Sequence, residues 1–237
     1  MEITILDSYA EISRKAAAVI TSQLEIKKDL LLCAATGNSP SGTYQLLEEE
    51  YGRRPELFAG MRVVKLDEWG GLPMSDPGTC ESYLQTHLLS PLQIGPERYL
   101  SFESDPTDPE MECRRMREEL MNAGPVDCCV IGIGVNGHIG LNEPAGILQP
   151  DFHVAQLAAT TLQHSMIEAM ERRPSYGLTL GVGDILKART ILLLISGASK
   201  KNIVRELLSK KVTTNIPASF LWLHPNTICL LDKEAAG

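Results

Sequence analysis

The chain has 237 residues, enough to bury a full core as one domain, and 43% of them are hydrophobic, an ordinary fraction for a globular protein. Its formal net charge of −8 argues against a nucleic-acid surface, which should be basic. The N-terminus lacks a basic start followed by an apolar stretch, and no window approaches the ~18 apolar residues of a membrane span. We therefore expect a cytoplasmic protein with no signal peptide and no membrane partner.

Apolar runs alternate with helical patterns along the chain. The runs predict buried strands, which are, in chain order, residues 3–6, 29–35, 61–66, 126–133, 190–195 and 227–231. Helical spacing and capping residues predict helices, which follow Asp7 or Ser8, follow Pro40, and cover residues 79–89, 110–120, 160–170, 178–186, 200–208 and 217–223. This alternation predicts a Rossmann-like α/β fold, one domain over residues 1–237, with a mostly parallel sheet and helices on both faces.

The six cysteines form no CxxC pair. Cys33, Cys128 and Cys129 lie within predicted strands, so we expect reduced core residues and no disulfides. Reduced thiols also agree with a cytoplasmic location.

Residues 130–144 read VIGIGVNGHIGLNEP and join the end of a buried strand to a polar, glycine-rich loop. The glycines, Gly137 among them, let the backbone turn tightly and approach a ligand. The polar residues of the loop are Asn136, His138, Asn142 and Glu143. Ligands of open α/β sheets bind just outside the carboxyl ends of the strands, so we expect chemistry here.

His138 and Glu143 are the main candidates for acid–base work in this loop. A carboxylate that orients an imidazole can serve proton transfer without a metal. A zinc site is a poor fit, because the two residues are not a helical i,i+4 pair and no third ligand is evident. The alternative is a structural histidine bonded to loop carbonyls. The loop also matches GxGxxG, but no clean helix follows, so we do not expect a dinucleotide site.

Two strand-to-helix turns are candidate phosphate sites, because free amides at a helix N-terminus and nearby hydroxyls suit an anion. The first turn supplies Thr36, Gly37, Asn38, Ser39 and Ser41. It is not a P-loop, and an ordinary turn with a Ser cap is an equal alternative. The second turn places Lys200 in the first turn of a helix, where a bound anion would offset the unfavourable dipole. A solvated surface lysine is the alternative, and taken alone it is favoured.

Asp67 and Glu68 follow the predicted strand at residues 61–66. Successive strand side chains point to opposite faces, so one of the two can face a cleft as a general base. A desolvated carboxylate there would have a raised pKa, which suits proton abstraction. The alternative is an acid that caps the following turn.

Three motifs together resemble the aminosugar-6-phosphate deaminase (isomerase) family, which acts on glucosamine or galactosamine 6-phosphate. They are ATGNSP at residues 35–40, KLDEWGGLP at residues 65–73 and GIGVNGHIGLNEP at residues 132–144, in the family's order and approximate spacing. The resemblance covers essentially the whole chain. The related 6-phosphogluconolactonases share the glycine-rich loops but lack the Asn-Glu-Pro ending. The segments KLDEW…PGTCE and IPASFLWLH look most like the galactosamine-6-phosphate isomerase branch.

The resemblance implies conversion of an aminosugar 6-phosphate and water into a ketose 6-phosphate and ammonia, with no cofactor and no metal. The product would be tagatose 6-phosphate from galactosamine 6-phosphate, or fructose 6-phosphate from glucosamine 6-phosphate. By the same resemblance, His138, oriented by Glu143, moves a proton at the ring oxygen, and Asp67 shuttles a proton between C2 and C1. Residues 36–41 and Lys200 would hold the phosphate. The resemblance also places Glu68 and Gly137 against the substrate.

Three departures from the family pattern bear on these expectations. Asn136 stands in the catalytic set where glucosamine-type members have Asp, and Asn can neither accept a proton nor carry charge. The helix after the Asn-Glu-Pro loop lacks the family's phosphate-binding Arg, and His164, Arg172 or Arg173 is a candidate substitute. The chain ends soon after its last predicted strand, so an oligomer is possible but the hexamer of allosteric members is not expected.

Two other functions stay open, each with a small sugar phosphate as partner. Asn136 weakens the deaminase set and so favours a 6-phosphogluconolactonase-like hydrolase or a simple aldose–ketose isomerase. A non-catalytic sugar-phosphate sensor would keep the pocket without the chemistry.

Overall fold

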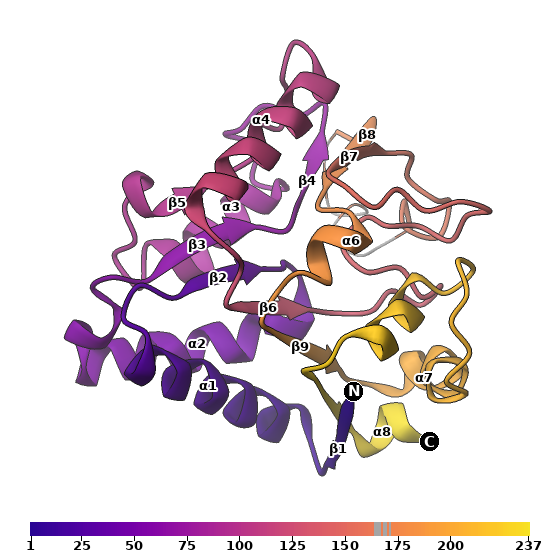
Figure 1. The fold of residues 1–237 in the computed structure, drawn as a ribbon, viewed down its shortest axis with the longest axis horizontal. Helices are drawn as coiled ribbons and strands as arrows, with labels where there is room; N and C mark the ends of the chain where they lie inside the picture. The colour runs from indigo at the N-terminus through magenta and orange to yellow at the C-terminus, as the bar shows by residue number, and fades with distance from the viewer. Residues whose placement is uncertain (164–166, 168–169, 171) are drawn as a thin grey trace.

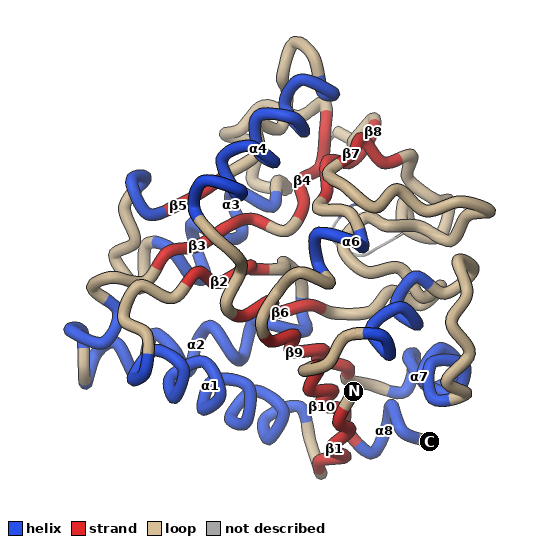
Figure 2. The backbone as a smooth tube through the Cα atoms, in the orientation of Figure 1, coloured by secondary structure: helices blue, strands red, loops and turns tan. Residues whose placement is uncertain are grey.

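Seven parallel strands form the main sheet of the computed structural model, which describes residues 1–163, 167, 170 and 172–237 (Figures 1 and 2). In spatial order the strands are β1 (Glu2–Leu6), β10 (Thr227–Asp232), β9 (Thr190–Ile195), β6 (Cys128–Ile131), β2 (Leu31–Ala34), β3 (Arg62–Lys65) and β5 (Tyr99–Leu100). Each predicted strand is present, and β5 is an addition at the edge. The α/β class and the mostly parallel sheet are therefore confirmed.

The central strands are apolar on both faces, so each face needs a cover of helices. In β6, Cys128 and Val130 belong to one buried cluster, whereas Cys129 and Ile131 belong to the other. The first cluster packs under α1 (Tyr9–Ile26), α2 (Asn38–Arg53), η1 (Pro55–Phe58), α3 (Cys80–Leu84) and the π-helical turn η2 (Gln85–Leu89). The second packs under α4 (Pro109–Ala123), α6 (Val182–Ile185), α7 (Lys201–Leu208), η5 (Pro217–Leu223) and α8 (Lys233–Ala236).

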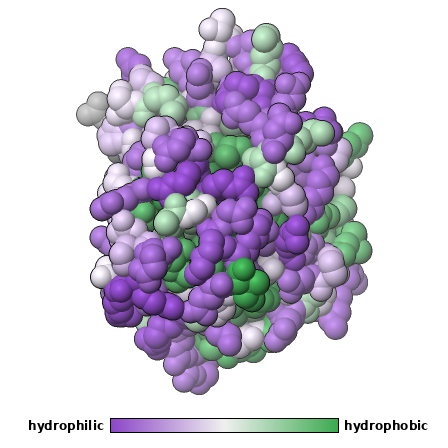
Figure 3. Space-filling view, turned by 60° about the vertical axis from the view of Figure 1, so that its left-hand side comes forward, coloured by the Kyte–Doolittle hydropathy of each residue, from purple (hydrophilic) through white to green (hydrophobic). Residues whose placement is uncertain are grey.

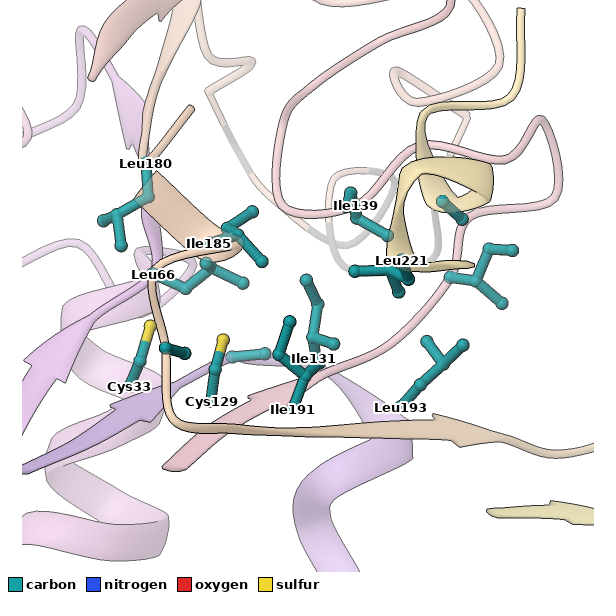
Figure 4. Close-up of a cluster of buried hydrophobic side chains, with 14 of the residues drawn as sticks. Cys33, Leu66, Cys129, Ile131, Ile139, Leu180, Ile185, Ile191, Leu193 and Leu221 are labelled. Atoms are coloured by element: carbon teal, nitrogen blue, oxygen red, sulfur yellow. The ribbon is translucent and has the colours of Figure 1, made fainter. Parts of the chain in front are cut away.

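Figure 1 shows this layering, with α1 and α2 on one side of the strands and α4 and α6 on the other. Figure 4 shows the second cluster, in which Cys129, Ile131 and Ile191 point from the sheet toward the layer that holds Ile185 of α6 and Leu221 of η5. All six cysteines are buried and free, which confirms the prediction for Cys33, Cys128 and Cys129. On the face shown in Figure 3, hydrophilic side chains predominate around smaller hydrophobic areas. Among the described helices, none is both long and apolar enough to cross a membrane.

A second, antiparallel sheet stands beside the main one and was not predicted. It consists of β4 (Asp67–Gly70), β8 (Tyr176–Thr179) and β7 (His153–Ala155), with β8 in the middle. The prediction of a helix over residues 178–186 was wrong in its first half, because β8 pairs with β4 and only Val182–Ile185 is helical. A short apolar run fits both the helical and the strand period. Here the open edge of β4, with which the run pairs, favours the strand.

The remaining elements differ little from expectation. Ser8, not Asp7, caps α1, and its side chain accepts from the Glu11 amide. The 3₁₀ turns η3 (Pro96–Arg98) and η4 (Ala198–Lys200) precede β5 and α7. The helix predicted over residues 160–170 lies partly outside the described residues, and residues 160–163 form turns.

Candidate active site

A cavity of about 430 Å³ opens at the carboxyl ends of β2 and β6. From β2 the next strands, β3 and β5, extend to one side, whereas β6 is followed by β9 and β10 on the other side. Such a change of direction leaves a crevice between neighbouring strands, where α/β proteins bind ligands. The predicted site residues that line the cavity are Thr36, Gly37, Asn38, Ser39, Asp67, Asn136, His138 and Lys200.

Asp67 is the first residue of β4 and stands on the cavity wall with 9% of its surface exposed. Burial, reinforced by the neighbouring Glu68 charge and opposed by Lys65, raises its pKa to about 7. A carboxyl group with that pKa exchanges a proton readily near neutral pH. Its role as a base stays a prediction, now with a physical basis.

Glu68 does not reach the cavity, so its expected contact with substrate is corrected. Strand alternation turns its side chain to the face opposite Asp67, where it is fully buried. Its carboxylate accepts the amides of Trp69, Cys80 and Glu81 at 2.8–2.9 Å and forms an ion pair with Lys65 at 2.6 Å. Glu68 is thus occupied entirely within the protein.

The loop after β6 brings His138, Glu143 and Asn136 together, although Glu143 lies behind the cavity wall. Glu143 Oε2 lies 3.2 Å from His138 Nδ1 and accepts from Asn136 Nδ2 at 2.8 Å. The His138 ring lies flush against Gly134, where a Cβ would stand 2.5 Å from the imidazole. A glycine is therefore required beside the imidazole.

Two threonines that sequence reasoning missed complete this group. Thr161 Oγ1 donates to Glu143 Oε1 and lies 3.3 Å from His138 Nδ1, and Thr160 Oγ1 accepts from Asn136 Nδ2 at 3.1 Å. Both threonines line the cavity. They follow Glu143 by 17 and 18 positions with no local motif, so only the fold shows the contact.

Glu143 is held as a carboxylate. Burial would raise its pKa, but the hydrogen bond and charge of His138 act in the opposite direction. Hydrogen bonds from Thr161 and Asn136 add to that effect, and the pKa falls to about 2. The group can therefore orient His138 and stabilise its protonated form without taking up the proton itself.

The N-terminus of α2 points its first turn at the cavity. Gly37 is the N-cap residue with φ +94°, a conformation that favours glycine, and no side chain caps the helix. Free amides there can hold an anion. Ser41 does not line the cavity, because its hydroxyl donates to the Gly37 carbonyl at 2.9 Å and lies 2.7 Å from the Tyr83 hydroxyl.

Lys200 is the one lysine or arginine among the described residues that line the cavity. Its Nζ donates to the Ile133 carbonyl at 2.6 Å, and burial lowers its pKa. The candidate substitutes for the family's arginine do not join it: Arg172 and Arg173 are exposed outside the lining, and His164 is outside the described residues.

Gly137 also lies outside the cavity lining, and its contact with substrate stays a prediction. Its φ is +91°, and a Cβ would stand 2.9 Å from Ile216 and 3.0 Å from Ile203. Gly137 thus shapes the loop by close packing against the following elements.

The arrangement suits proton transfer on an anionic substrate. Asp67 can exchange a proton near neutral pH, and the His138–Glu143 pair supplies a second proton carrier from a different loop. The α2 terminus and Lys200 can hold an anion at the same cavity. In the described part of the chain, no group of three or more His, Cys, Asp or Glu side chains is placed to hold a metal ion.

Known proteins are similar to this chain in sequence and in fold. A family model described as "Glucosamine-6-phosphate isomerases/6-phosphogluconolactonase" matches residues 7–229. The protein named "Putative deaminase AgaI" of Escherichia coli (strain K12) is 42% identical over 227 residues, which cover 96% of this chain and 90% of that one. Glucosamine-6-phosphate deaminase of Alkaliphilus metalliredigens (strain QYMF) is 36% identical, with 100% of this chain and 98% of that one covered.

Among solved structures, a monomeric glucosamine-6-phosphate deaminase of the NagB superfamily superposes with a TM-score of 0.93 at 35% identity, covering 100% of this chain and 99% of that one. The 6-phosphogluconolactonase of Leishmania guyanensis gives 0.80 at 20% identity, a likeness of fold alone, with 99% of this chain and 97% of that one covered. The chain therefore belongs to the glucosamine-6-phosphate isomerase/6-phosphogluconolactonase family, as its motifs predict.

Proposed function

We propose that this protein converts an aminosugar 6-phosphate and water into a ketose 6-phosphate and ammonia, using no cofactor, in the cytoplasm. The substrate is galactosamine 6-phosphate, giving tagatose 6-phosphate, or glucosamine 6-phosphate, giving fructose 6-phosphate; the branch motifs favour the first. One observation carries the proposal. Asp67, with a pKa of about 7, and the His138–Glu143 pair stand on one cavity that also holds an uncapped helix terminus.

Ring opening falls to His138. A neutral imidazole takes a proton from the sugar C1 hydroxyl and returns one to the ring oxygen, which yields the open-chain aldehyde. Glu143 holds the ring of His138 in place and stabilises its charge while it carries the proton. Thr161, bonded to both groups, keeps their mutual orientation.

Isomerisation falls to Asp67. Its carboxylate removes the proton from C2 while the 2-ammonium group loses a proton and the aldehyde oxygen gains one, which forms an enolamine. Asp67 then delivers its proton to C1, which leaves a protonated imine at C2. Water then adds to the imine and ammonia leaves, so that the C2 carbon becomes the ketone. A base with a pKa near the working pH serves both the removal and the return of the proton.

The substrate phosphate is held by the first-turn amides of α2 and by Lys200. This grip is remote from C1 and C2, so its binding energy can orient the reacting carbons. Every group of the proposed site comes from one chain, so an oligomer is possible but is not needed to complete it. A hexamer is not part of the proposal.

The direct test is ammonia release by the purified protein on galactosamine 6-phosphate and glucosamine 6-phosphate side by side. Asp67→Asn should lower turnover by ~10²-fold or more, whereas Asp29→Asn, an exposed acid before β2, should not. Near-normal turnover in Asp67→Asn would remove Asp67 from the mechanism.

The family description also names 6-phosphogluconolactonase, so lactone hydrolysis is the second candidate. Hydrolysis of 6-phosphogluconolactone without ammonia release from either aminosugar would favour it. Tight sugar-phosphate binding without any turnover would instead favour a sensor.

A further inference from the structure

Behind Asp67 lies a buried cluster of charges, formed by Lys65, Glu68 and Glu81. Lys65 ends β3 and is fully buried. Its Nζ donates to Glu68 Oε2 at 2.6 Å, to Glu81 Oε2 at 3.0 Å and to the Phe102 carbonyl at 2.9 Å. All three donor positions of the ammonium group are therefore occupied.

The two carboxylates are equally well satisfied. Glu68 accepts three backbone amides besides Lys65, and two of them open α3. Glu81 Oε2 accepts from the hydroxyls of Tyr99 at 2.9 Å and Ser101 at 2.8 Å. Burial would raise the pKa of Glu81, but the charge of Lys65 and the hydrogen bonds from Gln85, Ser101 and Lys65 outweigh it, so the pKa is lowered.

The cluster lies where the two sheets meet. Lys65 belongs to the main sheet, Glu68 to β4 of the second sheet and Glu81 to α3. Only Leu66 separates the end of β3 from Asp67 at the start of β4. Any shift of Glu68 relative to Lys65 therefore moves the strand that holds Asp67.

We propose that the Lys65–Glu68–Glu81 cluster positions Asp67 and sets the charge balance around its carboxyl group. One ammonium against two carboxylates leaves the cluster one negative charge in excess. That excess negative charge opposes ionisation of Asp67. The positive charge of Lys65 limits this effect, so that Asp67 can still act as a base near neutral pH. The catalytic relevance rests on the proposed function, whereas the electrostatic part does not.

Other ionisable groups also surround Asp67. Cys33 of β2 and Cys80 of α3 are neutral, because a hydrogen bond with Cys129 and burial raise the pKa of the first and burial raises that of the second. His138 and Lys200 stand on the same cavity wall. Of the charged groups, Glu68 raises the pKa of Asp67 and Lys65 lowers it, which is the pattern that the proposal requires of these two members of the cluster.

Two substitutions in the cluster should act in opposite directions. Lys65→Met keeps the length of the side chain and removes its charge, so the acidic limb of kcat/KM should move up by about one pH unit. Glu68→Gln removes the neighbouring negative charge, so the limb should move down by a similar amount. Both break a buried ion pair and should lower Tm, so a merely structural role predicts loss of stability without opposite shifts.

A milder variant and a remote control complete the set. Glu81→Gln alters a side chain that is 13% exposed and should move the limb down as well, which keeps the proposal testable if Lys65→Met does not fold. Lys27→Met breaks another ion pair, with Asp127 just before β6, and should leave the limb unchanged.

A readout independent of activity is the carboxyl NMR titration of ¹³C-aspartate-labelled protein, with Asp67 assigned by the signal lost in Asp67→Asn. The Asp67 titration should shift up in Lys65→Met and down in both glutamine variants. If the enzyme releases no ammonia but these shifts occur, the proposed function fails and the electrostatic inference stands. Unchanged titrations, or shifts in one common direction, would overturn the inference.

Discussion

Asp67 serves the proposed chemistry at the expense of stability. Its ordinary pKa is 3.8, and burial first, then Glu68, raises it to about 7 in the folded protein. Between these values the folded state binds the proton more tightly than the unfolded chain does. The contribution of Asp67 to stability is therefore present at low pH and is lost as the pH rises from about 4 to about 7.

Asp67→Asn should consequently make the protein more stable in alkaline solution. The amide cannot ionise, so the free energy of unfolding of the variant relative to wild type should grow by roughly 2.5 kcal/mol between pH 5 and pH 8. Denaturant unfolding at both pH values measures this. The exposed Asp29→Asn is the control, and an Asp67→Asn variant less stable than wild type at pH 8 would contradict the prediction.

Asn136 donates a hydrogen bond that an ionised aspartate at this position could not donate. Its Nδ2 donates to Glu143 Oε2 at 2.8 Å, and its Oδ1 accepts the His138 amide at 3.2 Å. An aspartate here would face Glu143 as a like charge, whereas the amide contributes to the lowered pKa of Glu143. The departure from the family pattern therefore fits the geometry of this loop.

Asn136→Asp should move the acidic limb of kcat/KM to higher pH. The added carboxylate faces Glu143 and His138. It favours the protonated form of His138, and it favours protonation of the pair of carboxylates that it forms with Glu143. Asn136→Ala, which removes the hydrogen bonds without adding charge, should lower activity and leave the limb in place. Identical limbs in wild type and Asn136→Asp would show that position 136 does not act electrostatically on the catalytic group.

At the scale of elements, two tyrosines fix the start of α2. Tyr83 donates to the Gly37 carbonyl at 2.8 Å, and Tyr9 donates to the Asn38 carbonyl and accepts the Gly42 amide, both at 2.7 Å. Tyr9 belongs to α1 and Tyr83 belongs to α3. The geometry of the proposed phosphate site thus depends on its neighbours as well as on its own loop.

Tyr83→Phe should raise KM about tenfold with little change in kcat. Loss of one partly buried hydrogen bond costs about 1–1.5 kcal/mol, and in the proposed complex the affected loop holds the phosphate and not the reacting carbons. Steady-state kinetics of ammonia release measure both constants. Tyr51→Phe, which packs on Phe58 of η1, is the control, and a fall in kcat at constant KM would place Tyr83 outside the phosphate grip.

The sequence predicts an element correctly where its hydrophobic pattern is long and fits only one period. TILLLI is apolar at every position after Thr190 and is β9, buried throughout. LTLGVGDIL contains only short runs that fit the strand period or the helical period. Its first part is a strand because it pairs with β4. Local motifs located Asn136 and His138, whereas Thr160 reaches Asn136 and Thr161 reaches His138 only through long-range folding.

At the scale of the molecule, the net charge of −8 opposes an anionic substrate, and local donors must outweigh it. Those donors come from two sides of the fold. The uncapped start of α2 follows β2, and Lys200 follows β9, beyond the point where the strand order reverses. A phosphate bound to both would link helices that cover opposite faces of the sheet.

Inorganic phosphate should therefore raise the Tm of the whole chain in proportion to its binding to this site. A ligand that binds only the folded state stabilises it by RT ln(1 + [L]/Kd), about 2.7 kcal/mol at 100 Kd. Lys200→Ala should reduce the rise in Tm and raise KM with little loss of kcat. Lys201→Ala removes the adjacent exposed lysine, which does not line this cavity, and should keep the full response. Equal responses in the two variants would place Lys200 outside the phosphate grip and leave the α2 amides as the candidate donors.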